Sequence, residues 1–178
     1  MYDDRKSWNV KDAEIMRELR GILDLTTEEC DLLKNLQPAA RDAAPRLVAE
    51  FYDRLLAHEP TREFIDDKER LASTLANWFT ELFCGNYDDA YAAKRLSIGN
   101  VHVRIGLPIR YPLAMMDLIA NHGERLASVS GEAAIKAFRK VLALDVATFN
   151  QAYENNQLRH LAELTGSERL ARRLLSGG

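Results

Sequence analysis

The 178-residue sequence predicts a single all-α domain built from six to eight helices. Apolar residues recur every three or four positions along most of the chain, which is the spacing of amphipathic helices. The sequence contains no Asn-Gly hairpin signal, no sustained alternation of apolar and polar residues and no internal repeat. With 9 glycines, 5 prolines and 47% hydrophobic residues, the composition excludes a disordered or collagen-like chain.

Helix-start signals place the first two helices. A short leading helix is expected over residues 8–20, where apolar residues at helical spacing are interleaved with charged ones. Thr26 and Glu29 then have the capping-box order, in which each side chain satisfies a free backbone N–H of the other residue. A second helix is therefore expected to begin there and to run to about Leu36.

Prolines mark the next boundaries. Proline is favoured in the first turn of a helix, so Pro38 and Pro45 predict the start of a third helix, which Pro60 ends. After a polar loop, the aspartate pair at 66–67 caps a fourth helix, which is rich in aromatic residues and ends near Gly85.

The second half of the chain is expected to hold three more helices. The first begins after the aspartate pair at 88–89 and reaches Ile105. The next opens at Pro108, and residues 128–131 form the turn before a long helix that ends near Leu164.

Residues 165–178 are predicted to form a separate helical connector. Thr165 and Glu168 repeat the capping-box order, and the following leucines and arginines fall on opposite faces of a helix. We therefore expect one domain over residues 1–164, followed by a connector that leads towards a further domain.

Composition argues against several functions. The formal charge of −3 and the pI of about 5.8 provide no basic field for nucleic acid or an anionic membrane. There is no apolar run of about 18 residues and no signal-peptide pattern, and Cys30 and Cys84 lack the number and spacing of a disulfide or zinc framework. A soluble, cytoplasmic protein with two buried thiols is expected.

Phosphate-binding, dinucleotide-binding, serine-hydrolase and zincin motifs are absent, so an enzyme has little support.

Four histidines are candidates for binding a cofactor. His58, His122 and His160 have ordinary structural or solvated explanations, because each lies near a helix end or in a polar stretch. His102 differs, since the segment 98–105 around it is mostly apolar and a neutral imidazole on an apolar helical face suits haem iron. Periodicity alone still favours the simpler interpretation, a hydrogen-bonded core histidine.

One segment carries a more specific signal. Residues 98–108, Ile-Gly-Asn-Val-His-Val-Arg-Ile-Gly-Leu-Pro, followed by Arg-Tyr at 110–111, resemble the proximal-histidine signature of the globin-coupled sensor family. Residues 51–55, Phe-Tyr-Asp-Arg-Leu, resemble the distal-tyrosine helix of that family, and residues 82–88 resemble its motif before the proximal helix. The resemblance spans roughly residues 8–164 and implies a globin-like helical sandwich with an extra N-terminal helix and no D helix.

The resemblance also assigns roles to single residues around a haem b group. It makes His102 the proximal ligand of the iron and Tyr52 the distal donor of a hydrogen bond to bound oxygen. Leu71 and Thr74 become distal residues on the following helix, where Leu75 helps to restrict access to the iron. The other residues expected in the wall of the cofactor site are Phe51, Leu55, Phe64, Trp78, Ile98, Ile105, Tyr111 and Met115 or Met116.

Ordinary roles stay open for two of these residues. The Tyr52 side chain can pack with its hydroxyl at the surface, and the Thr74 hydroxyl can bond its own helix backbone instead of Tyr52 or a water. Lys94, Arg95 and Arg104 are candidates for pairing with the haem propionates, although such residues usually form the solvated face of a helix.

The resemblance implies a haem-based sensor of oxygen, CO or NO, and not an enzyme. Members of the family form homodimers through their last two long helices and signal to a C-terminal diguanylate cyclase, kinase or chemotaxis transducer. A stripe of apolar residues along the last long helix suits either such an interface or an internal core. The stripe consists of Ile135, Phe138, Leu142, Val146, Phe149 and Tyr153.

Two other functions stay open. One is a cofactor-free helical interaction module, in which His102 and Tyr52 are packed core and the arginines of the tail bind an acidic partner. The other is a haem-dependent dioxygenase that needs a reductase partner. The colour of the purified protein distinguishes the first alternative from a haem sensor, and rapid turnover with an added reductase distinguishes the second.

Overall fold

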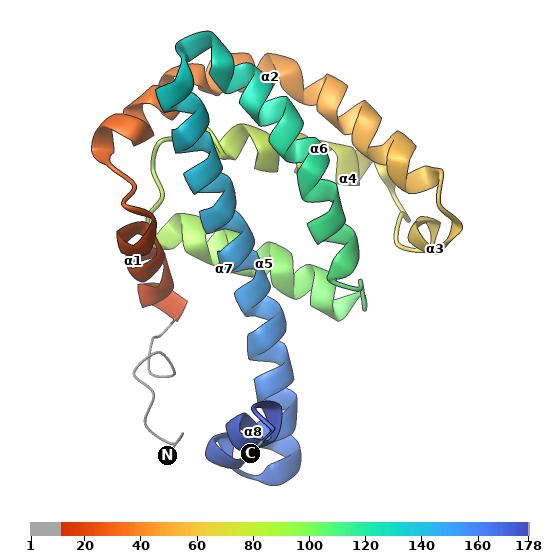
Figure 1. Ribbon diagram of the computed structural model, residues 1–178. Coiled ribbons are helices and arrows are strands. Elements are labelled where there is room, and N and C mark those ends of the chain that lie inside the picture. The colour runs from red at the N-terminus through yellow and green to blue at the C-terminus, as the bar shows by residue number, and fades with distance from the viewer. Residues whose placement is uncertain (1–11, 178) are drawn as a thin grey trace.

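The computed structural model describes residues 12–177, and nearly all of them are helical (Figure 1). No strand occurs in that range, so the predicted all-α class is confirmed. The leading helix is present, although Trp8, which the prediction included, lies outside the described residues. In chain order the elements are α1 (Asp12–Leu23), α2 (Thr27–Leu56), α3 (Glu59–Arg62), α4 (Lys68–Glu81), α5 (Asp89–Arg104), α6 (Arg110–Ala127), the 3₁₀ turn η2 (Ser128–Ser130), α7 (Glu132–Thr165) and α8 (Glu168–Leu175).

The helices cross one another around a single buried core. Helix α5 packs on α7, α2 packs on α4 and α6, and α6 packs on α7, while α1 lies against α5 and α7. In Figure 1, α2 bows over the top of the molecule, and α6 and α7 descend from it with α5 passing behind. The largest fully buried apolar side chains are Met16, Leu33, Leu47, Phe79, Leu82, Phe83, Tyr87, Leu118, Ile119, Phe138 and Leu144.

Helix α2 is continuous, so the break expected at its two prolines is wrong. Pro38 and Pro45 lie inside the helix, two turns apart on one face, and both are exposed. Each removes one backbone hydrogen bond, but the carbonyls that lose a partner are on the solvent side, where water serves instead. The opposite face carries Leu33, Ala40 and Leu47, all fully buried. Burial of the apolar face along the whole length of α2 thus outweighs the local preference of proline for a helix start.

Most of the predicted helix starts are confirmed. The capping box at Thr26 is formed in both directions, and the side chains of Asp67 and Asp88 cap α4 and α5. The prediction for the tail is wrong by two residues. Thr165 ends α7, with its hydroxyl bonded to that helix, and Ser167 is the residue that caps α8.

Two elements differ from a plain helical bundle. Between α2 and α4 the chain makes only the single turn α3, in which the Thr61 hydroxyl donates to the carbonyls of Leu55 and His58. At the other end, α7 projects below the other helices and α8 folds back against it, with Ala171 fully buried (Figure 1). No helix in the described range is long and apolar enough to span a membrane.

Candidate functional site

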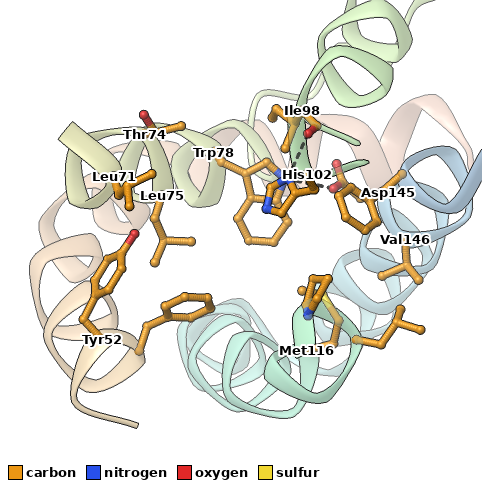
Figure 2. A pocket seen from close by; sticks show the side chains of 14 residues that line it. Tyr52, Leu71, Thr74, Leu75, Trp78, Ile98, His102, Met116, Asp145 and Val146 are labelled. Atoms are coloured by element: carbon orange, nitrogen blue, oxygen red, sulfur yellow. Dashed lines mark hydrogen bonds between the residues drawn. The ribbon is translucent and has the colours of Figure 1, made fainter. Parts of the chain in front are cut away.

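Two adjoining cavities lie among α2, α4, α5, α6 and α7, and Figure 2 shows the larger one. Their volumes are about 160 Å³ and about 120 Å³, and they share Phe51, Tyr52, Leu71, His102 and Pro112 as wall residues. All the residues that the sequence predicted for cofactor binding lie in these walls. The larger cavity also contains Thr74, Leu75, Trp78 and Ile98, and the smaller one also contains Phe64, Ile105, Tyr111 and Met115.

His102 lies near the C-terminal end of α5 and lines both cavities. Its Nδ1 atom is 2.8 Å from the carbonyl oxygen of Ile98, one turn earlier (Figure 2). Because a carbonyl only accepts, Nδ1 carries the proton and Nε2 is left with a lone pair. Burial lowers the pKa of His102, so its imidazole is neutral near pH 7. The ring of Phe149 meets the imidazole edge-on at a centroid distance of 5.3 Å and fixes its plane.

Tyr52 extends from α2 into the same cavity, and its hydroxyl points towards Leu71 and Leu75 of α4 (Figure 2). The side chain is only 5% exposed, which argues against the alternative of a surface hydroxyl. Burial raises the pKa of Tyr52 to about 12, so the hydroxyl stays protonated and is a hydrogen-bond donor at neutral pH. Among the described residues it has no hydrogen-bond partner. Its oxygen is not among the fully buried polar atoms without a partner, so the hydroxyl is a donor that faces the cavity and is available to a ligand there.

Thr74 lies in the cavity wall but uses its hydroxyl elsewhere. Its Oγ1 donates to the carbonyl oxygen of Arg70 at 3.0 Å, within α4, and its side chain is exposed. The structure therefore has the backbone-bonded alternative for Thr74, and the bond to Tyr52 is not formed.

Two of the three residues considered for the propionates lie elsewhere. Lys94 pairs with Glu81 at 3.0 Å on the outer side of α5. Arg95 is 1% exposed, in ion pairs with Glu81 and Asp145, so it belongs to the core and not to a solvated face. Arg104 is exposed, as expected. The prediction of two buried thiols is correct for Cys30 and wrong for Cys84, which is half-buried.

The apolar stripe of α7 packs inside the protomer. Phe138 is fully buried and stacks on Phe83 at 5.2 Å, while Val146 and Phe149 line the larger cavity. The Tyr153 hydroxyl donates to the carbonyl of Leu107 at 3.0 Å. Only Phe138 of the stripe is fully buried, and the other five residues are half-buried, so the stripe contributes to the core of the chain and also keeps surface for a helix interface.

Asp145 is a charged wall residue that was not predicted from the sequence. It is buried on α7, and its carboxylate accepts hydrogen bonds from Trp78, Tyr91 and Arg95. The only available signal was its position three residues after Leu142 on the apolar stripe, where an acidic residue is out of place. Leu55 and Met116, which were expected in the wall, line the smaller and the larger cavity. Other wall residues outside the predicted set are Pro112, Leu113, Val146 and Phe149 of the larger cavity and Thr61, Ile65 and Leu107 of the smaller.

Comparison with known proteins identifies the family. The sequence model of the Protoglobin family matches residues 12–159. The chain belongs to the Protoglobin family. A curated relative, the heme-based aerotactic transducer HemAT of Halobacterium salinarum, is 32% identical over 113 residues, and the match covers 54% of this chain and 23% of the transducer. The chain thus spans about a quarter of that relative's length.

A solved structure gives a match that covers more of the chain. The globin domain of the Geobacter sulfurreducens globin-coupled sensor superposes with a TM-score of 0.73 at 28% identity, covering 78% of this chain and 97% of that domain. The predicted globin-like fold and the resemblance to globin-coupled sensors are both confirmed. Membership of this globin family implies haem binding, and the likeness to sensor globins implies a role in haem-based gas sensing.

Proposed function

We propose that residues 1–164 form a haem b sensor domain that binds oxygen reversibly, and that CO and NO are further ligands. One observation carries the proposal: an imidazole with a free Nε2 and a hydroxyl donor share one apolar cavity system. The name of the Halobacterium transducer, heme-based and aerotactic, supports the same function.

The cavity residues fit a haem. The walls are aromatic and aliphatic, and both cavities contain His102 and Tyr52. The macrocycle is larger than either cavity, so it would occupy both, with His102 as the iron ligand. Haem supplies an iron that binds a diatomic gas reversibly. The carbonyl of Ile98 and the ring of Phe149 hold the imidazole in one tautomer and one plane, ready for that role.

Tyr52 is the residue that distinguishes among gases. With haem bound, the Tyr52 hydroxyl would donate a hydrogen bond to an oxygen ligand in the cavity, which is worth about 0.5–1.5 kcal/mol. CO carries less charge and gains less from the same donor. Figure 2 shows the side chains of Leu71 and Leu75 beside the Tyr52 hydroxyl, so apolar groups surround the donor. The site therefore favours oxygen relative to a cavity without the donor.

Signalling requires parts beyond the globin body. We propose that residues 165–178 connect the sensor to an output domain, either a diguanylate cyclase, a kinase or a chemotaxis transducer, in a cytoplasmic homodimer formed through α6 and α7. The matched segment makes up under a quarter of the Halobacterium transducer, which supports a linked output domain. The coupling free energy between two sites in a protein is typically about 1–3 kcal/mol. Making or losing one hydrogen bond at Tyr52 changes the free energy of oxygen binding by an amount of that order.

The visible absorption spectrum of the purified full chain tests the proposal. After addition of haem and reduction, we expect an intense Soret band that shifts on exposure to oxygen and reverts when oxygen is removed. His102→Ala should lose or change this band, while the control His58→Ala, at an exposed position, should keep it. A chain that takes up no haem would overturn the proposal and favour the interaction module. Rapid oxygen consumption with an added reductase would favour the dioxygenase.

A further inference from the structure

A charged group in the wall of an apolar cavity requires an explanation. Asp145 and Arg95 have side chains only 3% and 1% exposed, and the desolvation of two charges costs several kcal/mol per ion. The pairing does not compensate fully, because the Nη2 atom of Arg95 is buried without a hydrogen-bond partner among the described residues. Stability alone therefore does not account for the pair.

The geometry shows what the carboxylate does. Asp145 belongs to α7, and its two oxygens bind different helices. Oδ1 accepts from the Tyr91 hydroxyl at 2.6 Å and from Nε of Arg95, both on α5. Oδ2 accepts from the indole Nε1 of Trp78, on α4, at 2.9 Å. Figure 2 shows Asp145, His102 and the Trp78 indole in the wall of the same cavity.

The two ends of the carboxylate differ in how firmly they are held. On the α5 side, the Arg95 guanidinium stacks over the Tyr91 ring at 4.1 Å. Arg95 also binds Glu81 of α4 at 2.8 Å, so α4 and α5 are joined directly as well. On the α4 side, the Trp78 hydrogen bond is the contact to Oδ2. Helix α4 carries the distal Leu71 and Leu75, and α5 carries His102. Asp145 thus connects α4 and α5, which form two walls of the cavity, to α7.

We propose that Asp145 is a positioning residue of the cofactor site. It holds the Trp78 indole in the cavity wall and ties α4 and α5 to α7 beside the cavity that would hold the haem. The haem part of this inference rests on the proposed function, whereas the tether of Trp78 to Asp145 does not.

Replacing Asp145 by asparagine should break the hydrogen bond to Trp78 and keep the contacts to Tyr91 and Arg95. An amide has one acceptor oxygen, and in Asp145→Asn the charged donor Arg95 and the Tyr91 hydroxyl compete for it more strongly than one indole does. The amide NH₂ then faces the Trp78 N–H, donor against donor, and the indole loses its tether. Trp78→Phe removes the same hydrogen bond and leaves the ion pair of Asp145 with Arg95 intact. Glu124→Gln is a matched control, because it also replaces an acid by its amide and breaks an ion pair, to Arg139, outside the cavity.

The experiment uses the full chain carrying Trp8→Phe, in which Trp78 is the only tryptophan. The first readout is solvent exchange of the Trp78 indole N–H, followed by NMR in the haem-free protein. The second is the rate of haem transfer to an excess of a haem acceptor. We expect Asp145→Asn to accelerate indole exchange roughly tenfold or more, the effect of one hydrogen bond to a charged acceptor. Haem loss should accelerate by a similar factor in Asp145→Asn and in Trp78→Phe, and it should be unchanged in Glu124→Gln.

Three outcomes are decisive. Indole exchange unaltered in a folded Asp145→Asn chain overturns the tether. Haem loss at the parent rate in Trp78→Phe overturns the positioning role, and this variant serves equally if Asp145→Asn does not fold. Absence of haem uptake by the parent refutes the proposed function and the positioning of a cofactor together, while indole exchange still decides whether Asp145 holds Trp78.

Discussion

Replacing Tyr52 by phenylalanine should have opposite effects on folding and on gas binding. The substitution removes only a hydroxyl that is buried in the cavity wall without a partner among the described residues. The Tyr52 oxygen is not among the fully buried polar atoms without a partner, so it keeps some accessible surface and its removal costs the chain no internal hydrogen bond. The haem-free Tyr52→Phe chain should therefore unfold with an unchanged free energy, or one about 1 kcal/mol higher. With haem, the variant loses a hydrogen bond worth about 0.5–1.5 kcal/mol, so oxygen should dissociate roughly 2- to 10-fold faster.

Urea unfolding of the haem-free chain and stopped-flow oxygen dissociation measure the two effects. Tyr87→Phe is the matched control, because the Tyr87 hydroxyl is buried but donates to the carbonyl of Leu82 at 2.7 Å, outside both cavities. It should lower the free energy of unfolding by about 1 kcal/mol and leave oxygen dissociation unchanged. The reasoning is refuted if Tyr52→Phe destabilises the chain as much as Tyr87→Phe does and releases oxygen at the parent rate.

Three further substitutions test packing and electrostatics. A Cβ at Gly123 would lie 1.9 Å from the buried Phe138 ring, so Gly123→Ala should lower the free energy of unfolding by about 1–3 kcal/mol; a urea midpoint equal to that of the parent would contradict this. A Cβ at Gly99 would lie 2.5 Å from Cβ of Ala152, so Gly99→Ala should push α5 away from α7 and destabilise by a similar amount of about 1–3 kcal/mol. The control Gly21→Ala, in α1 with nothing within 4 Å, should instead stabilise by about 0.5–1 kcal/mol. The hydrogen bond from Arg139 lowers the pKa of Glu124 in the folded chain. The ion pair therefore stabilises the fold fully above the pKa of Glu124 in the unfolded chain, about 4.3, and this stabilisation is lost as the pH falls through the lower pKa of the folded chain. Glu124→Gln should therefore be less stable than the parent at pH 7, with the two unfolding curves converging in acid; a constant difference at every pH would count against the ion pair.

Local sequence signals predicted most of the fold. Capping residues such as Thr26, Asp67 and Asp88 act through bonds to a backbone three residues away, so a short stretch of sequence contains the whole interaction. The cavity residues followed from motifs around Tyr52 and His102, and the structure brings those two segments into one site.

What sequence reasoning missed depends on tertiary environment. Pro38 and Pro45 favour a helix start locally, but the buried face of α2 keeps the helix continuous through both. Arg95 was expected on a solvated face because its charge, and not its surroundings, is visible in the sequence. Its burial depends on Asp145, 50 residues away, whose hydrogen bonds to two other helices leave only a weak trace in the sequence pattern.

The central claim is that His102 holds the haem iron through Nε2, and the iron–histidine stretching band in the resonance Raman spectrum of the reduced, gas-free chain tests it most directly. We predict that the haem-loaded parent shows the band, that His102→Gly lacks it, and that added imidazole restores it by filling the vacated position. A His102→Gly chain that shows the parent band without imidazole would mean that another residue binds the iron, and the assignment of the site would be wrong.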